Sequence, residues 1–265
     1  MPSAKLSVVS ALLLAALLSG CSIKKIDVTA GKTPDEIYAL AKEEVANLQY
    51  TKGIELLEKL EGRAAGTPLA QQAQLDKAYA HFKNDEAAQA IATLDRFMRL
   101  HPASPAIDYA LYLKGIVNFN EDKGLFSSIT RQDLSERDQQ AAKESFAAFK
   151  ELVSRFPNSR YTPDASARMT YIVNSLAQYE VHVARYYYSR GAYVAAIGRA
   201  QQAIADYREA PALEEALYIL VQSYDALQLA PLRDDARRVL QANYPGSAFL
   251  GGKNTLNRSA WWKFW

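Results

Sequence analysis

The stretch TPDEIYALAKEEVANLQYTKGIELLEKLEGRAAGTP, residues 33–68, decides the fold. It opens with Thr33-Pro34 and closes with Thr67-Pro68, a pair of the same kind 34 residues further on. A hydroxyl residue followed by proline is typical of a helix start, because the hydroxyl caps free backbone N–H groups and proline suits the first turn. Glu36 completes a capping box at the first pair. A period of 34 residues is the length of a tetratricopeptide unit, which consists of two antiparallel helices.

Prolines at predicted helix starts recur along the chain, and successive ones are 34, 37, 58 and 48 residues apart. The second helix of each of the first four units is predicted from a stripe of small and bulky residues at helical spacing. We therefore predict an all-α solenoid of about five tetratricopeptide (TPR) helix pairs over residues 33–245, in place of two domains. The later starts are Ser104-Pro105, Thr162-Pro163 and Ala210-Pro211, the stripes begin at Gly53, Ala90, Ser145 and Ala196, and Pro102, Pro157 and Pro245 close three second helices.

Two of these intervals are longer than a TPR unit and predict insertions. About 24 extra residues fall around residues 118–138, and about 14 fall around residues 171–190, where a longer helix is expected. The first insertion contains Gly124-Leu125-Phe126 and Ile129 among charged residues. This apolar cluster either contacts a partner or folds back over its own repeat, and the second is favoured.

The composition agrees with helices and excludes several kinds of chemistry. Apolar residues make up 49% of the chain, alanine is abundant, and there are 12 Gly, 10 Pro and one Cys in 265 residues. Alanine combines high helix propensity with little bulk, which suits tightly crossing helices. A single cysteine excludes an internal disulfide, a redox pair and a cysteine-built zinc site. A net charge of +2 gives no reason to expect nucleic acid as a partner.

The N-terminus is typical of an exported, lipid-anchored protein. Lys5 precedes an apolar run that is too short to span a membrane, so residues 1–20 are predicted to be a signal peptide. Leu18-Ser19-Gly20-Cys21 resembles a bacterial lipobox, in which Cys21 would receive acyl chains. The alternative is an ordinary signal with an accidental cysteine. By resemblance to lipoprotein sorting, Ser22 implies the outer membrane, and residues 21–32 are predicted to form a flexible lipidated tether on its periplasmic face.

No constellation in the sequence predicts catalysis. His81, His101 and His182 are far apart and lack the spacing of metal ligands. Pairs of neighbouring carboxylates fit solvated helix faces better than acid/base catalysis, and neither a phosphate-binding nor a nucleophile motif occurs. We expect no catalytic residue, metal or cofactor, and hence no enzyme.

The first helix of each TPR pair lines the concave face of such arrays, and here it predicts an aromatic groove. Rings there bury large apolar area, and a lysine can meet a terminal carboxylate, so an extended peptide with aromatic residues and a free C-terminus would fit. Some of these rings could equally be core between helices. The predicted groove residues are Tyr38, Lys42, Tyr79, Phe82, Lys83, Tyr109, Tyr112 and Phe119.

The C-terminal part of the chain carries two further candidate surfaces. A tyrosine run around residues 186–193, with Arg190 within it and Arg199 beyond, has the composition of an interface, although tyrosines also pack between long helices. Residues 246–265 form a basic aromatic tail with three basic residues and no acid. Trp261, Trp262 and Trp265 suit a membrane interface or a hydrophobic partner, and the alternative is a tail that caps the last repeat.

With its lipobox, short tether and five repeats, the chain resembles the BamD family, lipoproteins of the outer-membrane β-barrel assembly (BAM) machinery. The likeness extends from Cys21 to Pro245. The stretches that carry it are Glu36-Ile37-Tyr38-Ala39, Gln71-Gln72-Ala73-Gln74-Leu75-Asp76, Ala78-Tyr79-Ala80, Asp95-Arg96-Phe97-Met98-Arg99-Leu100, Phe156-Pro157-Asn158-Ser159 and Arg190-Gly191-Ala192-Tyr193-Val194-Ala195.

The resemblance implies binding to the POTRA region of the barrel subunit BamA and to other BAM lipoproteins through the C-terminal repeats. It also implies that the N-terminal repeats receive unfolded β-barrel precursors. Arg199, and less strongly Arg190, occupy positions that the family would associate with BamA. Two alternatives remain, a periplasmic TPR scaffold that coordinates envelope or peptidoglycan synthesis and a murein-remodelling lipoenzyme.

Overall fold

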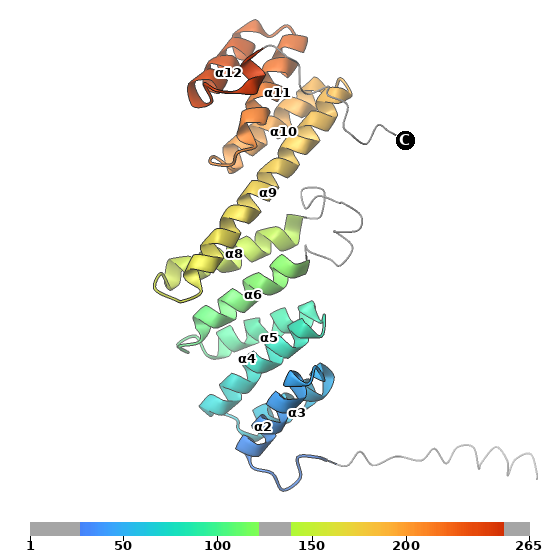
Figure 1. Cartoon of the computed structure of the whole chain (residues 1–265), viewed down its shortest axis with the longest axis vertical. Coiled ribbons are helices and arrows are strands. Elements are labelled where there is room, and N and C mark those ends of the chain that lie inside the picture. Colours follow the sequence, from blue (N-terminus) through green and yellow to red (C-terminus); the bar gives the residue numbers. More distant parts are fainter. Residues whose placement is uncertain (1–26, 122–138, 252–265) are drawn as a thin grey trace, which may run out of the picture.

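A computed structural model describes residues 27–121 and 139–251. Its ten α-helices form five antiparallel pairs that stack along one axis, each helix packing on the next in sequence (Figure 1). This arrangement confirms the predicted all-α solenoid. The pairs are α2 (Pro34–Ala46) with α3 (Tyr50–Arg63), α4 (Pro68–Lys83) with α5 (Ala87–Leu100), α6 (Ile107–Glu121) with α8 (Gln139–Arg155), α9 (Thr162–Ser189) with α10 (Tyr193–Asp206), and α11 (Leu213–Ala226) with α12 (Ala230–Asn243), before a 3₁₀ turn, η2 (Ala248–Gly251).

The first two helix starts follow the predicted chemistry. The backbone N–H of Glu36 donates to the Thr33 hydroxyl (3.3 Å), and the backbone N–H of Thr33 donates to the Glu36 carboxylate (2.7 Å). This is the predicted capping box. Thr67 caps α4 through its hydroxyl in the same way.

The later starts differ from the prediction. Thr162 is the first residue of α9 and not its cap, because its hydroxyl donates to the carbonyl of Phe156 (2.8 Å) and ties the helix to the preceding turn. Ser104 does not cap α6 either. That helix begins at Ile107, and the Ser104 hydroxyl accepts from the backbone N–H of Ala106 (3.4 Å), which precedes the helix. The proline therefore marks each boundary to within two residues, while the cap varies.

The second helices bury the predicted stripes, and the third pair shows how closely the helices approach. Gly115 of α6 faces the fully buried ring of Phe149 on α8, and a Cβ at Gly115 would lie 2.4 Å from that ring. The Ser145 hydroxyl on α8 donates to the Gly115 carbonyl (2.8 Å). The two backbones can approach this closely because both positions carry small side chains.

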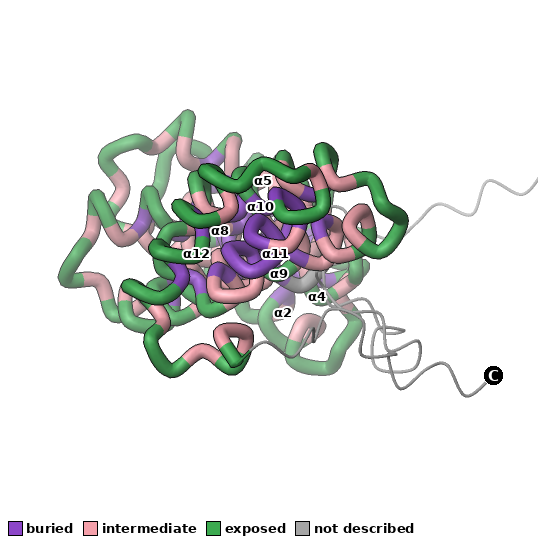
Figure 2. The backbone as a smooth tube through the Cα atoms, turned by 90° about the horizontal axis from the view of Figure 1, so that it is seen from above, coloured by how far each residue is buried: buried purple, intermediate pink, exposed green. Residues whose placement is uncertain are grey.

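Helix α9 is the longer helix that the spacing predicts, with 28 residues. Its first half packs into the core cluster formed with α4, α5, α6 and α8, through Ile172 and Leu176. Its second half packs into the cluster formed with α10, α11 and α12, through Val181 and Ala184. The buried residues accordingly lie inside the stack and the exposed ones around it (Figure 2). Helix α9 thus belongs to both cores.

The turns within four of the five pairs have one conformation. Each contains a residue in the left-handed region just after the first helix, and the N–H groups that follow bond back to the last carbonyls of that helix. Glycine is favoured at such positions, yet only one of the four is glycine. The residues and their φ angles are Leu48 (61°), Asp85 (58°), Gly191 (75°) and Gln228 (60°).

The segment before α2 is more ordered than a flexible tether would be. The sequence predicted such a tether over residues 21–32, but residues 27–32 fold into turns against α3, and Thr29 is fully buried. The Arg63 guanidinium donates to the carbonyl of Thr29 (2.7 Å), a contact 34 residues away that no local pattern reveals. Cys21, the apolar cluster at residues 124–129 and the three tryptophans of the tail lie outside the described residues. Among the helices that are described, none is both long and apolar enough to span a bilayer.

Candidate functional site

Tyrosines from α2, α4, α6 and the turn before α9 lie along the first helices of the repeats. We call this surface the aromatic face, formed by Tyr38, Tyr79, Tyr109, Tyr112 and Tyr161.

Two tyrosines of the aromatic face connect successive repeats. The hydroxyl of Tyr38 on α2 donates to Asp76 of α4 (2.8 Å), and the hydroxyl of Tyr112 on α6 donates to Asp164 of α9 (2.8 Å). In both cases a tyrosine on one first helix bonds to an aspartate on the first helix of the next repeat. These bonds fix the orientation of both rings and leave them half-buried.

Stacking fixes the middle of the face. The ring of Tyr161 stacks on Tyr112 with centroids 4.7 Å apart and also contacts Tyr109 at 5.7 Å. The guanidinium of Arg160 lies 4.8 Å from the centroid of the Tyr161 ring. Stacked pairs of this kind add about 0.5–1.5 kcal/mol beyond area burial. The face is therefore formed before any ligand binds.

Three tyrosine hydroxyls of the aromatic face, those of Tyr38, Tyr109 and Tyr112, have a raised pKa and remain neutral at physiological pH. Burial, with the Asp76 carboxylate, raises the pKa of Tyr109 to about 12. Burial and the hydrogen bond to Asp76 likewise raise the pKa of Tyr38, and burial and Asp164 raise that of Tyr112. Burial opposes ionisation of Asp164, but hydrogen bonds from Arg168 and Tyr112 outweigh it and lower its pKa. The face thus combines neutral aromatic rings with fixed carboxylates.

The predicted groove residues are only partly brought together. Tyr79 is 39% exposed on the aromatic face, whereas Phe82 is half-buried against the core. Phe119 is buried, edge-on to Tyr171 (5.7 Å), so it belongs to the core rather than to a groove. Lys42 lies 3.4 Å from Asp76, an ion pair that competes with its predicted role of meeting a terminal carboxylate.

Lys83, the last residue of α4, is exposed. Lys42 is exposed as well, but its ammonium is paired with Asp76.

Sequence reasoning missed the partners of the tyrosines. The spacing of the sequence predicted no functional role for Asp76, Tyr161 or Asp164, because their contacts depend on how one repeat stacks on the next. One signal was available, since Asp164 follows Pro163 directly and therefore had to lie at the start of a first helix.

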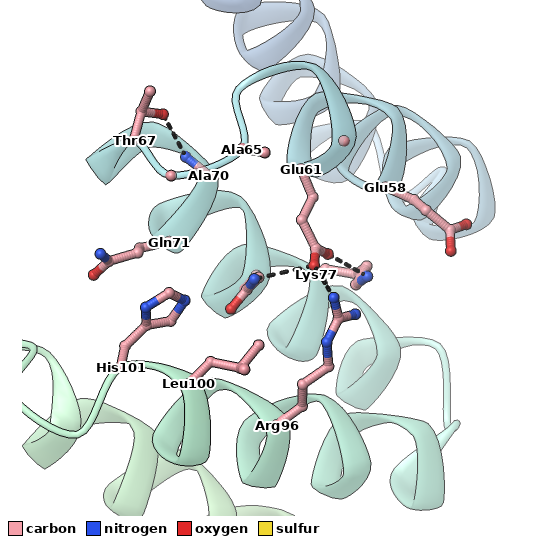
Figure 3. A pocket seen from close by; sticks show the side chains of 13 residues that line it. Glu58, Glu61, Ala65, Thr67, Ala70, Gln71, Lys77, Arg96, Leu100 and His101 are labelled. Carbon is pink, nitrogen blue, oxygen red and sulfur yellow. Dashed lines mark hydrogen bonds and ion pairs between the residues drawn. The ribbon is translucent and has the colours of Figure 1, made fainter.

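A cavity of about 550 Å³ lies on a different side of α4, between α3, α4 and α5 (Figure 3). The Glu61 carboxylate stands at its wall and accepts from Lys77 (2.8 Å), Gln74 (3.0 Å) and Arg96 (2.8 Å). Burial disfavours the charge of Glu61, but these donors outweigh it and lower its pKa. With its carboxylate satisfied by three donors from α4 and α5, Glu61 fixes the second repeat on the first.

A second candidate surface lies on α9 and α10, where Arg199 pairs with an acid that the sequence did not indicate. The Arg199 guanidinium donates to Glu180 of α9 (3.0 Å), whose side chain is 4% exposed against 40% for Arg199. The hydrogen bond to Glu180 raises the pKa of Arg199. One side of the guanidinium therefore neutralises a buried carboxylate while the rest faces solvent.

The last turn of α9 carries most of the tyrosine run, and Tyr193 begins α10. Tyr187 and Tyr188 pack against the C-terminal core, as the packing alternative expected. Tyr186 is 52% exposed with the Arg190 guanidinium 5.2 Å from its ring centroid, and Val194 is 73% exposed. Arg190 and Tyr186 thus lie at the surface, on the same pair of helices as Arg199.

The ionisable groups of the described chain do not form a metal site. No group of three or more His, Cys, Asp and Glu side chains in this part is arranged to hold a metal ion. His81 instead lies 2.6 Å from Glu86 in the turn after α4.

Comparison with known proteins identifies the family. Residues 30–240 match the family model YfiO, described as an outer membrane lipoprotein. Proteins called outer membrane protein assembly factor BamD are 45% identical in Neisseria meningitidis (94% of this chain, 95% of that protein) and 44% identical in Neisseria gonorrhoeae (93% and 92%). The protein of that name in Vibrio cholerae is 34% identical (90% and 99%). The chain therefore belongs to the BamD (YfiO) family of outer membrane lipoproteins.

Proposed function

We propose that this protein is a non-enzymatic component of the β-barrel assembly machinery of the outer membrane. Its relatives carry the name of an outer membrane protein assembly factor and share this chain over nearly their whole length. In this proposal the first three repeats receive unfolded β-barrel precursors, and the fourth and fifth bind the POTRA region of BamA and other BAM lipoproteins.

The observation that carries precursor recognition is the preformed aromatic face. A precursor segment with aromatic side chains would lie along Tyr79, Tyr109 and Tyr112. The Tyr112 ring is held by its bond to Asp164 and by stacking on Tyr161, which also contacts Tyr109. A preformed surface loses little conformational entropy on binding, so the binding free energy is not spent on ordering the receptor. Lys83 would meet the carboxylate at the end of a precursor.

The half-exposed Arg199 supports the binding of BamA. Arginine is enriched at interface hot spots, and its planar guanidinium can satisfy one carboxylate while donating to another. Arg199 already neutralises Glu180, which fixes the position of its free N–H groups. Arg190 and Tyr186 would extend the same contact surface.

Cys21 would carry acyl chains and hold the protein at the periplasmic face of the outer membrane. Each buried CH₂ contributes about 0.8 kcal/mol, so several chains give a stable anchor where one chain does not. Labelling with a radioactive fatty acid should succeed for the natural chain and fail for Cys21→Ser. Label that persists on Cys21→Ser would contradict the lipobox assignment. The tail tryptophans Trp261, Trp262 and Trp265 are proposed as a further membrane or partner contact.

Gentle purification of the tagged protein from membranes tests the assignment as a whole. We expect BamA and further BAM lipoproteins to come with it. Recovery of cell-wall synthesis enzymes alone would favour the envelope scaffold. Release of fragments from purified sacculi would favour the murein-remodelling enzyme. Either result would overturn the proposal.

A further inference from the structure

We infer that the first repeat carries a clamp that sets how far the solenoid can stand from the lipid surface. The inference rests on the proposed anchoring of Cys21. The clamp consists of Asp27 and Thr29, which precede α2, and Lys59 and Arg63, which lie in the last half of α3.

The contacts of the clamp are numerous for so short a segment. One oxygen of Asp27 accepts from Lys59 (2.7 Å) and from the backbone N–H (3.1 Å) and hydroxyl (2.7 Å) of Thr29. Arg63 donates to the carbonyl (2.7 Å) and the hydroxyl (2.9 Å) of Thr29 and lies 3.5 Å from the other oxygen of Asp27. Hydrogen bonds from Lys59 and Thr29 lower the pKa of Asp27, so its carboxylate is charged at physiological pH.

These contacts continue without a break into the solenoid. Thr29 is fully buried, its carbonyl also accepts from the N–H of Lys32 (3.2 Å), and the capping box at Thr33 follows at once. Residues 27–33 therefore belong to the folded first repeat, and the clamp holds them on α3 from the side.

The consequence for the anchor is a matter of chain length. Six residue steps separate Cys21 from Asp27, and a fully extended chain covers at most about 3.6 Å per step, or about 22 Å. Without the clamp, thirteen steps separate Cys21 from Pro34, with a limit of about 47 Å. For a random chain the mean end-to-end distance grows as the square root of its length. Release of the clamp would therefore raise the mean distance between Cys21 and the solenoid about 1.5-fold.

This limit keeps the N-terminal end of the solenoid close to the membrane. The pair α2–α3 lies at one end of the stack and the pair α11–α12 at the other (Figure 1). An anchor of about 22 Å keeps α2–α3, and the start of the aromatic face at Tyr38, near the lipid headgroups. The surface proposed to bind precursors would thus begin beside the membrane that receives them.

Energy transfer between the solenoid and the membrane tests the inference. A donor dye is placed on Ala39→Cys, an exposed position of α2, because acylation of the only natural cysteine leaves this thiol as the only reactive one. The lipidated full-length protein is reconstituted into vesicles that contain a headgroup-labelled acceptor lipid. Lys59→Ala with Arg63→Ala should lower the transfer, as expected from a 1.5-fold greater separation.

The matched control is Lys52→Ala, which removes an α3 lysine that pairs with Glu44 and takes no part in the clamp. It should leave the transfer unchanged. Asp27→Asn provides a second clamp variant should the double variant fail to fold by circular dichroism. Equal transfer in the natural chain and in a folded clamp variant would overturn the inference. Failure of the natural chain itself to associate with vesicles would instead contradict the proposed anchor.

Discussion

Arg199 has two separable roles, as the counterion of buried Glu180 and as a proposed contact with BamA. Replacing Arg199 affects both roles, and a second substitution at Glu180 restores only the first. The Glu180 side chain is 4% exposed, and Arg199 donates to it at 3.0 Å. Removing one partner of a fully buried pair costs about 3–5 kcal/mol, since it leaves an uncompensated charge. The Arg199 side chain is 40% exposed, so water can enter beside Glu180 and reduce that cost. We expect Arg199→Ala to destabilise the protein by roughly 1–3 kcal/mol.

The assay combines thermal unfolding with binding to the isolated POTRA region of BamA. For a chain of this size, 1 kcal/mol corresponds to about 2–4 °C in Tm. Glu180→Gln in the Arg199→Ala background replaces the stranded carboxylate with a neutral amide. It should therefore recover most of the lost Tm.

Binding should behave differently from stability. If the solvent-facing part of Arg199 contacts BamA, POTRA binding should stay weak in the double variant even though its Tm has recovered. Recovery of binding together with Tm would refute the interface role and leave Arg199 as the counterion of Glu180 alone. An unchanged Tm in Arg199→Ala would refute the reasoning about the buried carboxylate.

Three further predictions concern the solenoid itself. Leu48→Gly should raise stability by about 1 kcal/mol in thermal unfolding, because Leu48 is 68% exposed and its positive φ is costly for a residue with a Cβ; a fall in Tm would contradict this. Gly115→Ala should lower stability by roughly 1–3 kcal/mol, because its Cβ would lie 2.4 Å from the buried Phe149 ring. Gly198→Ala, where the added Cβ meets nothing, should raise stability by about 1 kcal/mol. Stability changes of the same sign in both variants would contradict the packing of α6 on α8. Tyr112→Phe should cost about 1 kcal/mol and weaken binding of barrel-derived peptides in a titration, because it removes the bond to Asp164; unchanged binding would argue against a preformed face.

Much of the fold could be predicted because its determinants are local. The spacing from Pro34 to Pro68 reflects one helix pair, and the stripe from Gly53 to Leu60 faces the partner helix of the same pair. The interval beyond Pro163 predicted the long helix α9 for the same reason. Turns were harder to predict, since Leu48 adopts a conformation that its residue type disfavours.

The candidate site could be predicted only in part, because its contacts cross from one repeat to another. Tyr38 and Tyr112 were identified from their register, but their partners Asp76 and Asp164 follow from the stacking of the repeats. The buried partner of Arg199 was hidden although it lies within the same repeat, because Glu180 is on the other helix of the pair, 19 residues away in sequence.

The clamp on Thr29 was hidden too, because Arg63 is the last residue of α3 and lies 34 residues from Thr29 in sequence. Local patterns therefore revealed the helices but not the side-chain contacts between segments distant in sequence.

Site-specific photo-crosslinking in growing cells tests the central claim most directly. A photoreactive residue replaces Tyr79, which is 39% exposed on the aromatic face, and, as a matched control, Leu229, which is 41% exposed in the fifth repeat. We expect adducts between position 79 and newly exported β-barrel precursors, and none with precursors at position 229. Adducts at position 79 with cell-wall enzymes only, or equal precursor adducts at both positions, would contradict it.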